Sequence, residues 1–478
     1  MNFSSLTLEI LVASLAMLLL VSDLWAGPRV RSRLGFVSMA GLFAILAISF
    51  NIAPCAPGSA DSMLAQDGLA LFFQRFFLVT AIFIVFMANL CADRIPMGIG
   101  EFHVIVLVAL TGMMLAAAAN DFVMVFVALE LMSICFYVLV SFQRSRLCSL
   151  EAGVKYLILS ALSASILVFG IALIFGSANE TNFVRLNAAG AALDQNKVYW
   201  LGMLLVLFGL SFKIAAFPLQ VWAPDVYQGA PTPVTAFLAI GSKAAGFVLV
   251  LRVLFLAMPR LALQWDKILM LAAGITILYG NLCAIPQRNL KRLLGYSSIS
   301  NAGYLLLGVV AFSASGSAAV LYYLAGYLFT LAAAFLIIGL VMRDSEDIGT
   351  LAGLGRRSPF LAAALSLVMV SLAGIPPLAG FLGKFLLLRA LIERGAVDCY
   401  CYWLAGVALV GVVISLYYYF AVIRVMYWAK DPPDLSPIAV PAGVRIPLAV
   451  CMAAMLYLGI FPRAVLASAM DAVKSLNF

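Results

Sequence analysis

Residues 198–220 read VYWLGMLLVLFGLSFKIAAFPLQ, an apolar run that contains one lysine, Lys213, and a proline, Pro218. About 20 consecutive apolar residues are enough for a helix to cross a bilayer. Lys213 has apolar neighbours on both sides, and Pro218 removes a backbone hydrogen bond and bends a helix. The run therefore predicts a membrane-spanning helix that is broken close to an ionisable group.

The composition of the whole chain agrees with a membrane protein. Of its 478 residues, 65% are hydrophobic and 10% are charged, and the mean hydropathy is +1.11. Soluble proteins have about 25% charged residues. This chain has too little charge to cover the surface of a water-soluble globule, which excludes an ordinary soluble enzyme.

Long apolar runs recur along the chain and are separated by short polar segments. They are continuous, whereas the strands of a membrane barrel alternate between apolar and polar residues. We expect an all-α membrane protein of about fourteen transmembrane helices. The predicted spans are 5–22, 34–51, 68–90, 102–118, 121–142, 153–176, 198–220, 232–257, 267–285, 293–312, 317–341, 358–392, 402–427 and 445–462.

No segment between the spans is long enough for a second domain, so residues 1–478 are predicted to form one polytopic membrane domain. We assign helices 1–3 to residues 1–100, a first repeat to 101–260, a second repeat to 261–430, and helix 14 with the C-terminus to 431–478.

The Lys and Arg residues predict the orientation. Of the 29, fifteen lie in loops after odd-numbered helices and nine in even-numbered loops and the tails. Cytoplasmic loops carry the excess of Lys and Arg. Odd-numbered loops are therefore expected in the cytoplasm and both termini on the outer side. The net charge of +8 reflects this topology, and we do not expect nucleic-acid binding.

Among the charged residues inside apolar spans, four are candidates for buried groups: Glu130 in helix 5, Lys213 in helix 7, Lys243 in helix 8 and Lys384 in helix 12. A lysine at the bilayer centre costs about 2.5–3.5 kcal/mol. Burial disfavours the charged form of such a group, and a nearby opposite charge favours it. Groups balanced between these effects exchange protons, so the four residues are candidates for a proton relay, with Glu130 acting on Lys213.

Two alternatives remain open at this stage. A buried Glu130–Lys213 pair could simply hold two helices together. Lys155, beside Glu151 at the start of helix 6, is either an interfacial anchor or the entrance of the relay.

Two broken helices suggest an internal repeat. Helix 7 is predicted to break at Ala216–Leu219 and again around Ala223–Asp225, and helix 12 at Ala373–Leu378. Corresponding breaks in two halves are typical of transporters. Helices 4–8 and 9–13 then form two five-helix repeats, which are inverted because five is odd.

The second repeat differs from the first in its polar residues. Helix 10 has no acidic residue opposite Glu130, only the run Tyr296–Asn301. We expect hydroxyl groups and water to serve in this half; alternatively, the Ser and Asn residues only join helices by hydrogen bonds.

Sites for redox cofactors, metals or nucleotides are not evident. The chain has one histidine, His103, and its eight cysteines include no C-x-x-C pair. No G-x-G-x-x-G follows a strand. We therefore expect no cofactor and no metal in this chain.

Three long motifs carry a resemblance to a known family. They are Lys213–Phe237 with Ser242-Lys243, Lys291–Tyr304 (KRLLGYSSISNAGY) and Ser371–Lys384 (SLAGIPPLAGFLGK). In this order they resemble the antiporter-like membrane subunits of respiratory complex I, the proton-translocating NADH:quinone oxidoreductase.

The resemblance implies a proton-translocating, non-redox subunit of that enzyme in a bacterial inner membrane. It implies that Glu130, Lys213, Lys243 and Lys384 form the proton path, and that other membrane subunits are partners, including a second antiporter-like subunit. FMN, iron–sulfur clusters and quinone would belong to other subunits. The alternatives are a subunit of a related cation/proton antiporter and a membrane scaffold.

Overall fold

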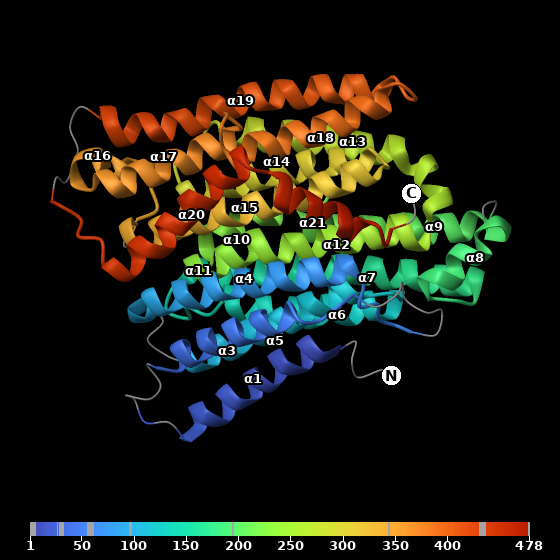
Figure 1. Ribbon diagram of the computed structural model, residues 1–478, viewed down its shortest axis with the longest axis horizontal. Helices are drawn as coiled ribbons and strands as arrows, with labels where there is room; N and C mark the ends of the chain where they lie inside the picture. Colours follow the sequence, from blue (N-terminus) through green and yellow to red (C-terminus); the bar gives the residue numbers. More distant parts are fainter. Residues whose placement is uncertain are drawn as a thin grey trace. The chain divides into compact units, whose positions relative to one another are not determined.

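The computed structural model describes residues 6–25, 27, 33–54, 62–94, 98–193, 196–342, 345–429 and 436–476 (Figure 1). Within this part of the chain, the secondary structure is helical apart from isolated bridges of one residue pair. Twelve helices are long and apolar enough to cross a membrane, and two shorter apolar helices, Leu34–Ser49 and Pro359–Ala373, join them. Together they correspond to the fourteen predicted spans, and the predicted fold class is confirmed.

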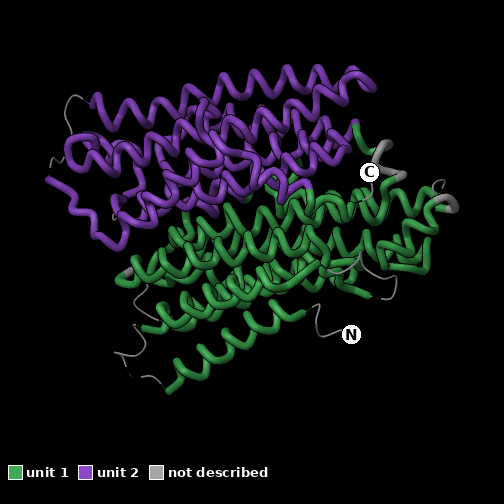
Figure 2. Tube along the Cα trace, in the orientation of Figure 1, with its two compact units in different colours: residues 1–222, 229–266, 471–478 green, residues 223–228, 267–470 purple. Residues whose placement is uncertain are grey.

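Residues 1–222, 229–266 and 471–478 form unit 1, and residues 223–228 and 267–470 form unit 2 (Figure 2). The helices up to residue 266 are α1 (Thr7–Trp25), α3 (Leu34–Ser49), α4 (Gly68–Leu90), η2 (Ala92–Arg94), α5 (Ile99–Ala118), α6 (Phe122–Val140), α7 (Leu147–Ala178), α8 (Phe183–Leu193), α9 (Lys197–Ile214), α10 (Trp222–Gly229), α11 (Thr232–Phe237), η3 (Leu238–Ser242), α12 (Lys243–Arg252) and η4 (Val253–Ala257).

The remaining helices are α13 (Pro259–Ala284), α14 (Leu290–Val310), α15 (Ala314–Val341), η5 (Ile348–Leu351), α16 (Leu354–Arg357), α17 (Pro359–Ala373), α18 (Ala379–Gly395), α19 (Tyr400–Trp428), α20 (Ala442–Ile460) and α21 (Arg463–Val473). The α8 and α21 helices were not predicted, because each is only 11 residues long and neither is a continuous apolar run.

Short polar residues start several of the spans. The side chains of Asp67, Asp121, Asn196, Asn289 and Ser313 each accept a hydrogen bond from a backbone N–H in the first turn of the following helix. These caps satisfy donors that have no partner within the helix. In an apolar sequence with few polar residues, they define where a span begins.

The predicted breaks in helices 7 and 12 are confirmed in part. The first lies between α9 and α10, and the second between α17 and α18. The additional break predicted around Ala223–Asp225 is wrong, since α10 begins at Trp222 and continues through these residues. Pro224 lies in the first turn of α10, where a missing N–H leaves no intrahelical bond unmade.

Each unit contains the same backbone pairing between two of its helices. Clamp 1 joins Asn120–Phe122, at the start of α6, to Thr181–Phe183, after α7: Phe122 N donates to Thr181 O (3.1 Å), and Phe183 N to Asn120 O (3.0 Å). Clamp 2 joins Arg288–Leu290, at the start of α14, to Glu346–Ile348, after α15. There Leu290 N donates to Glu346 O (2.9 Å) and Ile348 N to Arg288 O (2.8 Å).

The clamps support the predicted internal repeat. The second and third helices of the first repeat are α6 and α7, and those of the second repeat are α14 and α15. In each repeat, backbone hydrogen bonds join the start of the second helix to the segment that follows the third helix. The domain boundaries themselves stay a prediction.

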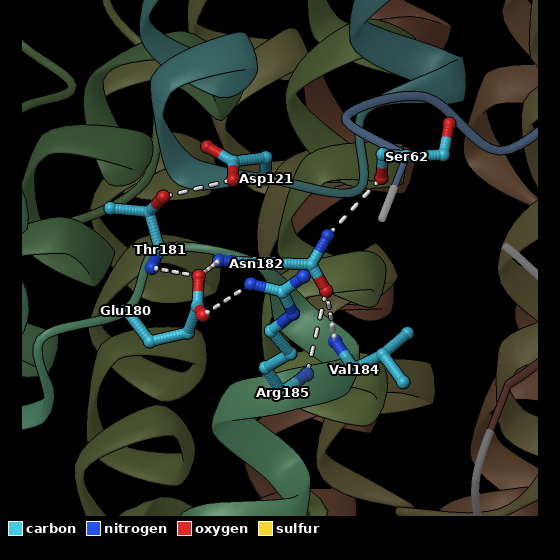
Figure 3. A network of polar contacts seen from close by, with 7 residues as sticks. All are labelled: Ser62, Asp121, Glu180, Thr181, Asn182, Val184 and Arg185. Atoms are coloured by element: carbon cyan, nitrogen blue, oxygen red, sulfur yellow. Dashed lines mark hydrogen bonds and ion pairs between the residues drawn. The ribbon is translucent and has the colours of Figure 1, made fainter. Parts of the chain in front are cut away.

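Side chains reinforce clamp 1, as Figure 3 shows. Thr181 Oγ1 donates to Asp121 Oδ2 (2.9 Å), and Asn182 Nδ2 donates to Ser62 O (3.1 Å). The Glu180 carboxylate accepts hydrogen bonds from Asn182 N (3.1 Å), Thr181 N (2.9 Å) and Arg185 NH1 (3.1 Å). The backbone N–H of Asn182, followed by that of Thr181 and the Arg185 guanidinium, holds the pKa of Glu180 below its ordinary value.

Two cations counted with the loop charges are buried: Lys291, and Arg252, which lies within the predicted span 232–257 near its end. Arg252 is 0% exposed and donates to Asp67 Oδ1 (2.7 Å) and Ala117 O (2.6 Å). Lys291 is 1% exposed and pairs with Glu346 Oε1 at 2.7 Å. One of the two was counted on each side of the membrane, so leaving both out does not change which side has more Lys and Arg residues. Arg29, Arg31, Arg343 and Lys430, which were also counted, lie outside the described residues.

A carboxylate whose pKa is lower in the folded state than in the unfolded state stabilises the fold at a pH above the unfolded-state pKa. This stabilisation is lost as the pH falls through the folded-state pKa. Glu180→Gln should therefore flatten the loss of thermal stability on acidification below about pH 4.3, the ordinary Glu value. The melting temperature, followed by intrinsic tryptophan fluorescence from pH 7 to pH 3, measures this effect. Identical acid dependence in the variant and the unchanged chain would contradict the role given to Glu180.

Candidate proton-relay residues

Lys213 lies in the last turn of α9, directly before the first break. Ala215 follows with a left-handed φ of 55°, which ends the helix. The Lys213 side chain is 5% exposed, and its Nζ donates to Ser133 Oγ (2.7 Å) on α6 and to Tyr156 OH (3.3 Å) on α7. At the break, Phe212 O accepts hydrogen bonds both from Ala215 N (3.1 Å) and from Trp222 Nε1 (2.9 Å). Lys213 thus lies among hydroxyl groups at a helix end.

Glu130 lies one turn before Ser133 on α6, so the two side chains share a face of the helix. The Glu130 carboxylate and the Lys213 ammonium group interact electrostatically. Among the described residues, however, no ion pair within 4.0 Å joins them. The predicted pairing is therefore at longer range, because Ser133 occupies the position next to the ammonium group.

Lys243 is 1% exposed and begins α12, directly after the π-helical turn Leu238–Ser242. Such turns insert an extra residue into a helix and are frequent at functional sites. One turn later, Gly246 lies against α9, where an added Cβ would be 3.1 Å from Lys213 Cβ and 2.7 Å from Ile214 Cγ2. Because Gly246 has no side chain, the helix that carries Lys243 packs closely against the helix that carries Lys213.

Lys384 belongs to unit 2 and lies in α18, after the second break. It is 4% exposed, and its Nζ donates to Leu372 O (2.7 Å), a carbonyl in the last turn of α17. A cation at the carbonyl end of a helix is stabilised by the helix dipole. The ammonium group also lies 4.8 Å from the centre of the Tyr304 ring, and Tyr304 OH donates to Ala408 O (3.0 Å).

Lys155 lies apart from the buried lysines. Its side chain is 44% exposed and forms an ion pair with Glu151 at 2.7 Å, one turn earlier on α7. The next residue, Tyr156, points inward and contacts Lys213. This geometry favours the anchor interpretation of Lys155 over the entrance of the relay.

In unit 2, the predicted polar run on α14 forms a buried hydrogen-bond network. Asn301 Oδ1 accepts from Tyr323 OH on α15 (2.8 Å), and Asn301 Nδ2 donates to Ser297 Oγ (3.4 Å). Ser298 Oγ bonds to Tyr227 OH at 3.0 Å. Asn301 follows the N-cap of α14 by twelve residues, as Ser133 follows that of α6. Asn301 and Tyr323 thus correspond to Ser133 and Tyr156, without an ammonium group bonded between them.

The sequence did not reveal the two buried ion pairs, Arg252–Asp67 and Lys291–Glu346. Each of these residues stands at or near the end of an apolar run, which is where solvent-exposed charges also occur. The usable signal was the presence of Arg252 inside a predicted span, because a charge at that depth requires a partner.

Within the described residues, fourteen apolar helical elements with breaks beside the buried Lys213 and Lys384 define a polytopic membrane protein with the broken helices of a transporter. Residues 119–415 match the family described as NADH:quinone oxidoreductase/Mrp antiporter, TM. The chain belongs to this family, as its sequence predicted.

Similar proteins are known by sequence and by structure. NADH-quinone oxidoreductase subunit N of Moorella thermoacetica is 39% identical over 463 residues, which cover 96% of both chains. A chain of respiratory complex I from Thermus thermophilus with bound aureothin superposes with a TM-score of 0.82 at 32% identity, over 96% of this chain and 98% of that one. A chain of the Mrp complex from Dietzia sp. DQ12-45-1b shares the fold (TM-score 0.82, 23% identity, 100% and 98% covered).

The contact at Gly246 gives a prediction about packing. Gly246→Val would place side-chain atoms into Ile214 and Lys213 on α9, and overpacking of this kind costs about 1–3 kcal/mol. We expect a lower melting temperature of the detergent-solubilised protein, measured by tryptophan fluorescence. The matched control is Gly406→Val on α19, where an added Cβ meets nothing within 4 Å. Equal melting temperatures for the two variants would contradict close packing of α12 on α9.

Proposed function

We propose that this chain translocates protons as a membrane subunit of NADH:quinone oxidoreductase through Lys213, Lys243 and Lys384, under the influence of Glu130. The family and the shared name of the relatives establish the membrane-subunit role. The residue roles rest on one observation: two lysines with almost no exposure lie on helices that touch at Gly246.

In this proposal, Lys213 receives a proton while its Nζ is held by the hydroxyl groups of Ser133 and Tyr156. A negative charge at Glu130 stabilises the charged form of Lys213, and its removal or withdrawal favours release of the proton. Water then carries the proton to Lys243. Lys384 in unit 2 is the next carrier, and the carbonyl end of α17 stabilises its charged form through the bond to Leu372 O and the helix dipole.

The chemical energy comes from elsewhere in the enzyme. NADH oxidation and quinone reduction, with FMN and iron–sulfur clusters, are assigned to other subunits, and this chain acts without a redox group of its own. The Lys and Arg distribution supports a location with odd-numbered loops in the cytoplasm and both termini on the outer side of a bacterial inner membrane.

An exposed face of α6 supports a partner subunit. Val123, Val127, Ile134 and Val138 are 43%, 47%, 56% and 44% exposed and recur at helical spacing. Glu130 is partly exposed on the same face, three residues after Val127. An ionisable side chain that faces lipid at mid-span is costly. We infer that another membrane subunit of the enzyme covers this face.

Substitution of the buried lysines tests the relay. Lys213→Ala and Lys384→Ala should each lower the ratio of protons translocated to NADH oxidised, because a proton carrier is lost while the redox groups lie in other subunits. Proton uptake by inside-out vesicles, measured together with NADH oxidation, gives this ratio. Lys155→Ala is the control and should keep the original ratio. An unchanged ratio in assembled Lys213→Ala enzyme would refute the role of Lys213.

Photo-crosslinking tests the partner face. A benzoylphenylalanine at position 127 should form adducts with another membrane subunit in the assembled enzyme, seen as a mass shift on denaturing gels. The same residue in membranes that lack the other subunits is the control and should yield lipid adducts alone. Lipid adducts alone in the assembled enzyme would show that the face is not covered.

A further inference from the structure

Unit 1 also contains a buried glutamate that is not among the proposed relay residues. Glu9 stands in the first turn of α1 and is 3% exposed. Its Oε1 accepts a hydrogen bond from Gln74 Nε2 on α4 (2.6 Å). Gln74 in turn exchanges hydrogen bonds with Gln66, at 2.7 and 3.0 Å, directly before the start of α4. We refer to these three side chains as the Glu9 cluster.

The other carboxyl oxygen of Glu9 lacks a protein partner. Oε2 is buried, and within the described part of the chain no donor forms a hydrogen bond with it. A buried carboxylate without compensating donors or cations is far less stable than the neutral acid, which carries no net charge. With one hydrogen bond to Oε1 and none to Oε2, the geometry suits a carboxylic acid whose hydroxyl group is on Oε2.

The two arginines that lie beside or contact the α4 segment of the cluster, Arg75 and Arg252, form their contacts with other groups. Arg75 follows Gln74, but its NH2 donates to Ser49 O (2.8 Å) and its guanidinium lies over the Phe50 ring at 4.7 Å. Arg252 is paired with Asp67. Among the described residues, no ion pair to Glu9 is formed.

The helices packed on α1 bring no other charge to Glu9. The α3 helix contains no charged residue. On α5, Glu101 and His103 lie near Gly100, against which Asp23 packs. Asp23 is fourteen residues after Glu9 on α1, or about 21 Å at 1.5 Å per residue. These three titratable groups therefore lie near the opposite end of α1.

The Glu9 cluster lies near the starts of α1 and α4, which are both candidate membrane spans. Leu6, before α1, packs against a small core of Leu64, Ala70 and Ala118, which are the approach to α4, its first turn and the end of α5. A group at such an end is nearer to bulk water than one at mid-span.

We propose that Glu9 is a proton-binding site, a carboxylic acid whose proton exchanges with water at this end of unit 1. The site binds a proton through Oε2 while Gln74 holds Oε1, and Gln66 keeps the Gln74 amide in place. The site does not include Glu130 or the three relay lysines, so this proposal can be tested separately from the proposed relay.

Infrared difference spectroscopy of the assembled enzyme at pH 7 tests this site. The spectrum of the unchanged enzyme minus that of Glu9→Gln should contain one carbonyl-stretch band of a protonated carboxyl, and this band should shift in heavy water. In Gln74→Met, which removes the hydrogen bond to Oε1, the same band should move to higher frequency. Glu130→Gln should leave the band unchanged, which distinguishes Glu9 from the relay acid.

Two results would overturn the proposal. A carboxylate band in place of the carboxylic acid band would show that Glu9 is ionised. A carboxylic acid band that does not shift in heavy water after prolonged incubation would show that the proton does not exchange. Either result leaves the proton-to-NADH ratio of the lysine variants, and hence the relay, untouched.

Discussion

The arrangement of this protein depends on the need to stabilise ammonium groups that lie at membrane depth. A lysine in the bilayer interior is unfavourable by a few kcal/mol unless polar groups surround it. The chain provides such groups at broken helices, where backbone carbonyls and hydroxyl groups become available without a full countercharge. Lys384 bonds to a carbonyl at the end of α17, and Lys213 lies at the end of α9 among the hydroxyl groups of α6 and α7.

How strongly its surroundings stabilise a buried ammonium group determines how readily the lysine releases its proton. A lysine fixed in a tight ion pair keeps its proton, and one in dry apolar packing loses it. Ser133 is the direct hydrogen-bond partner of Lys213, and Glu130 lies beyond ion-pair distance, which is the arrangement that the proposed relay requires. The two units differ in their buried polar groups: unit 1 has an acid, a serine and a tyrosine near Lys213, whereas unit 2 has a network of Asn301, Tyr323 and serine hydroxyl groups.

Much of this could be predicted from the sequence because the bilayer imposes simple rules. Span length, the presence of lysines inside spans and the prolines that break helices are all local features, and they led to the fold class and the two main breaks. The contacts between distant segments were not predictable in the same way. Nothing local pairs Arg252 with Asp67 or places Gly246 against Lys213, because such contacts depend on how whole helices pack.

The most direct measurement of the relay in unit 1 is the density of ordered water in a high-resolution cryo-electron-microscopy map of the assembled enzyme. Proton transfer between Lys213 and Lys243 requires ordered waters that link the two Nζ atoms by hydrogen bonds, and we expect to see them beside Gly246. Closely packed apolar side chains between the two ammonium groups, with no density for water, would contradict proton transfer along this route.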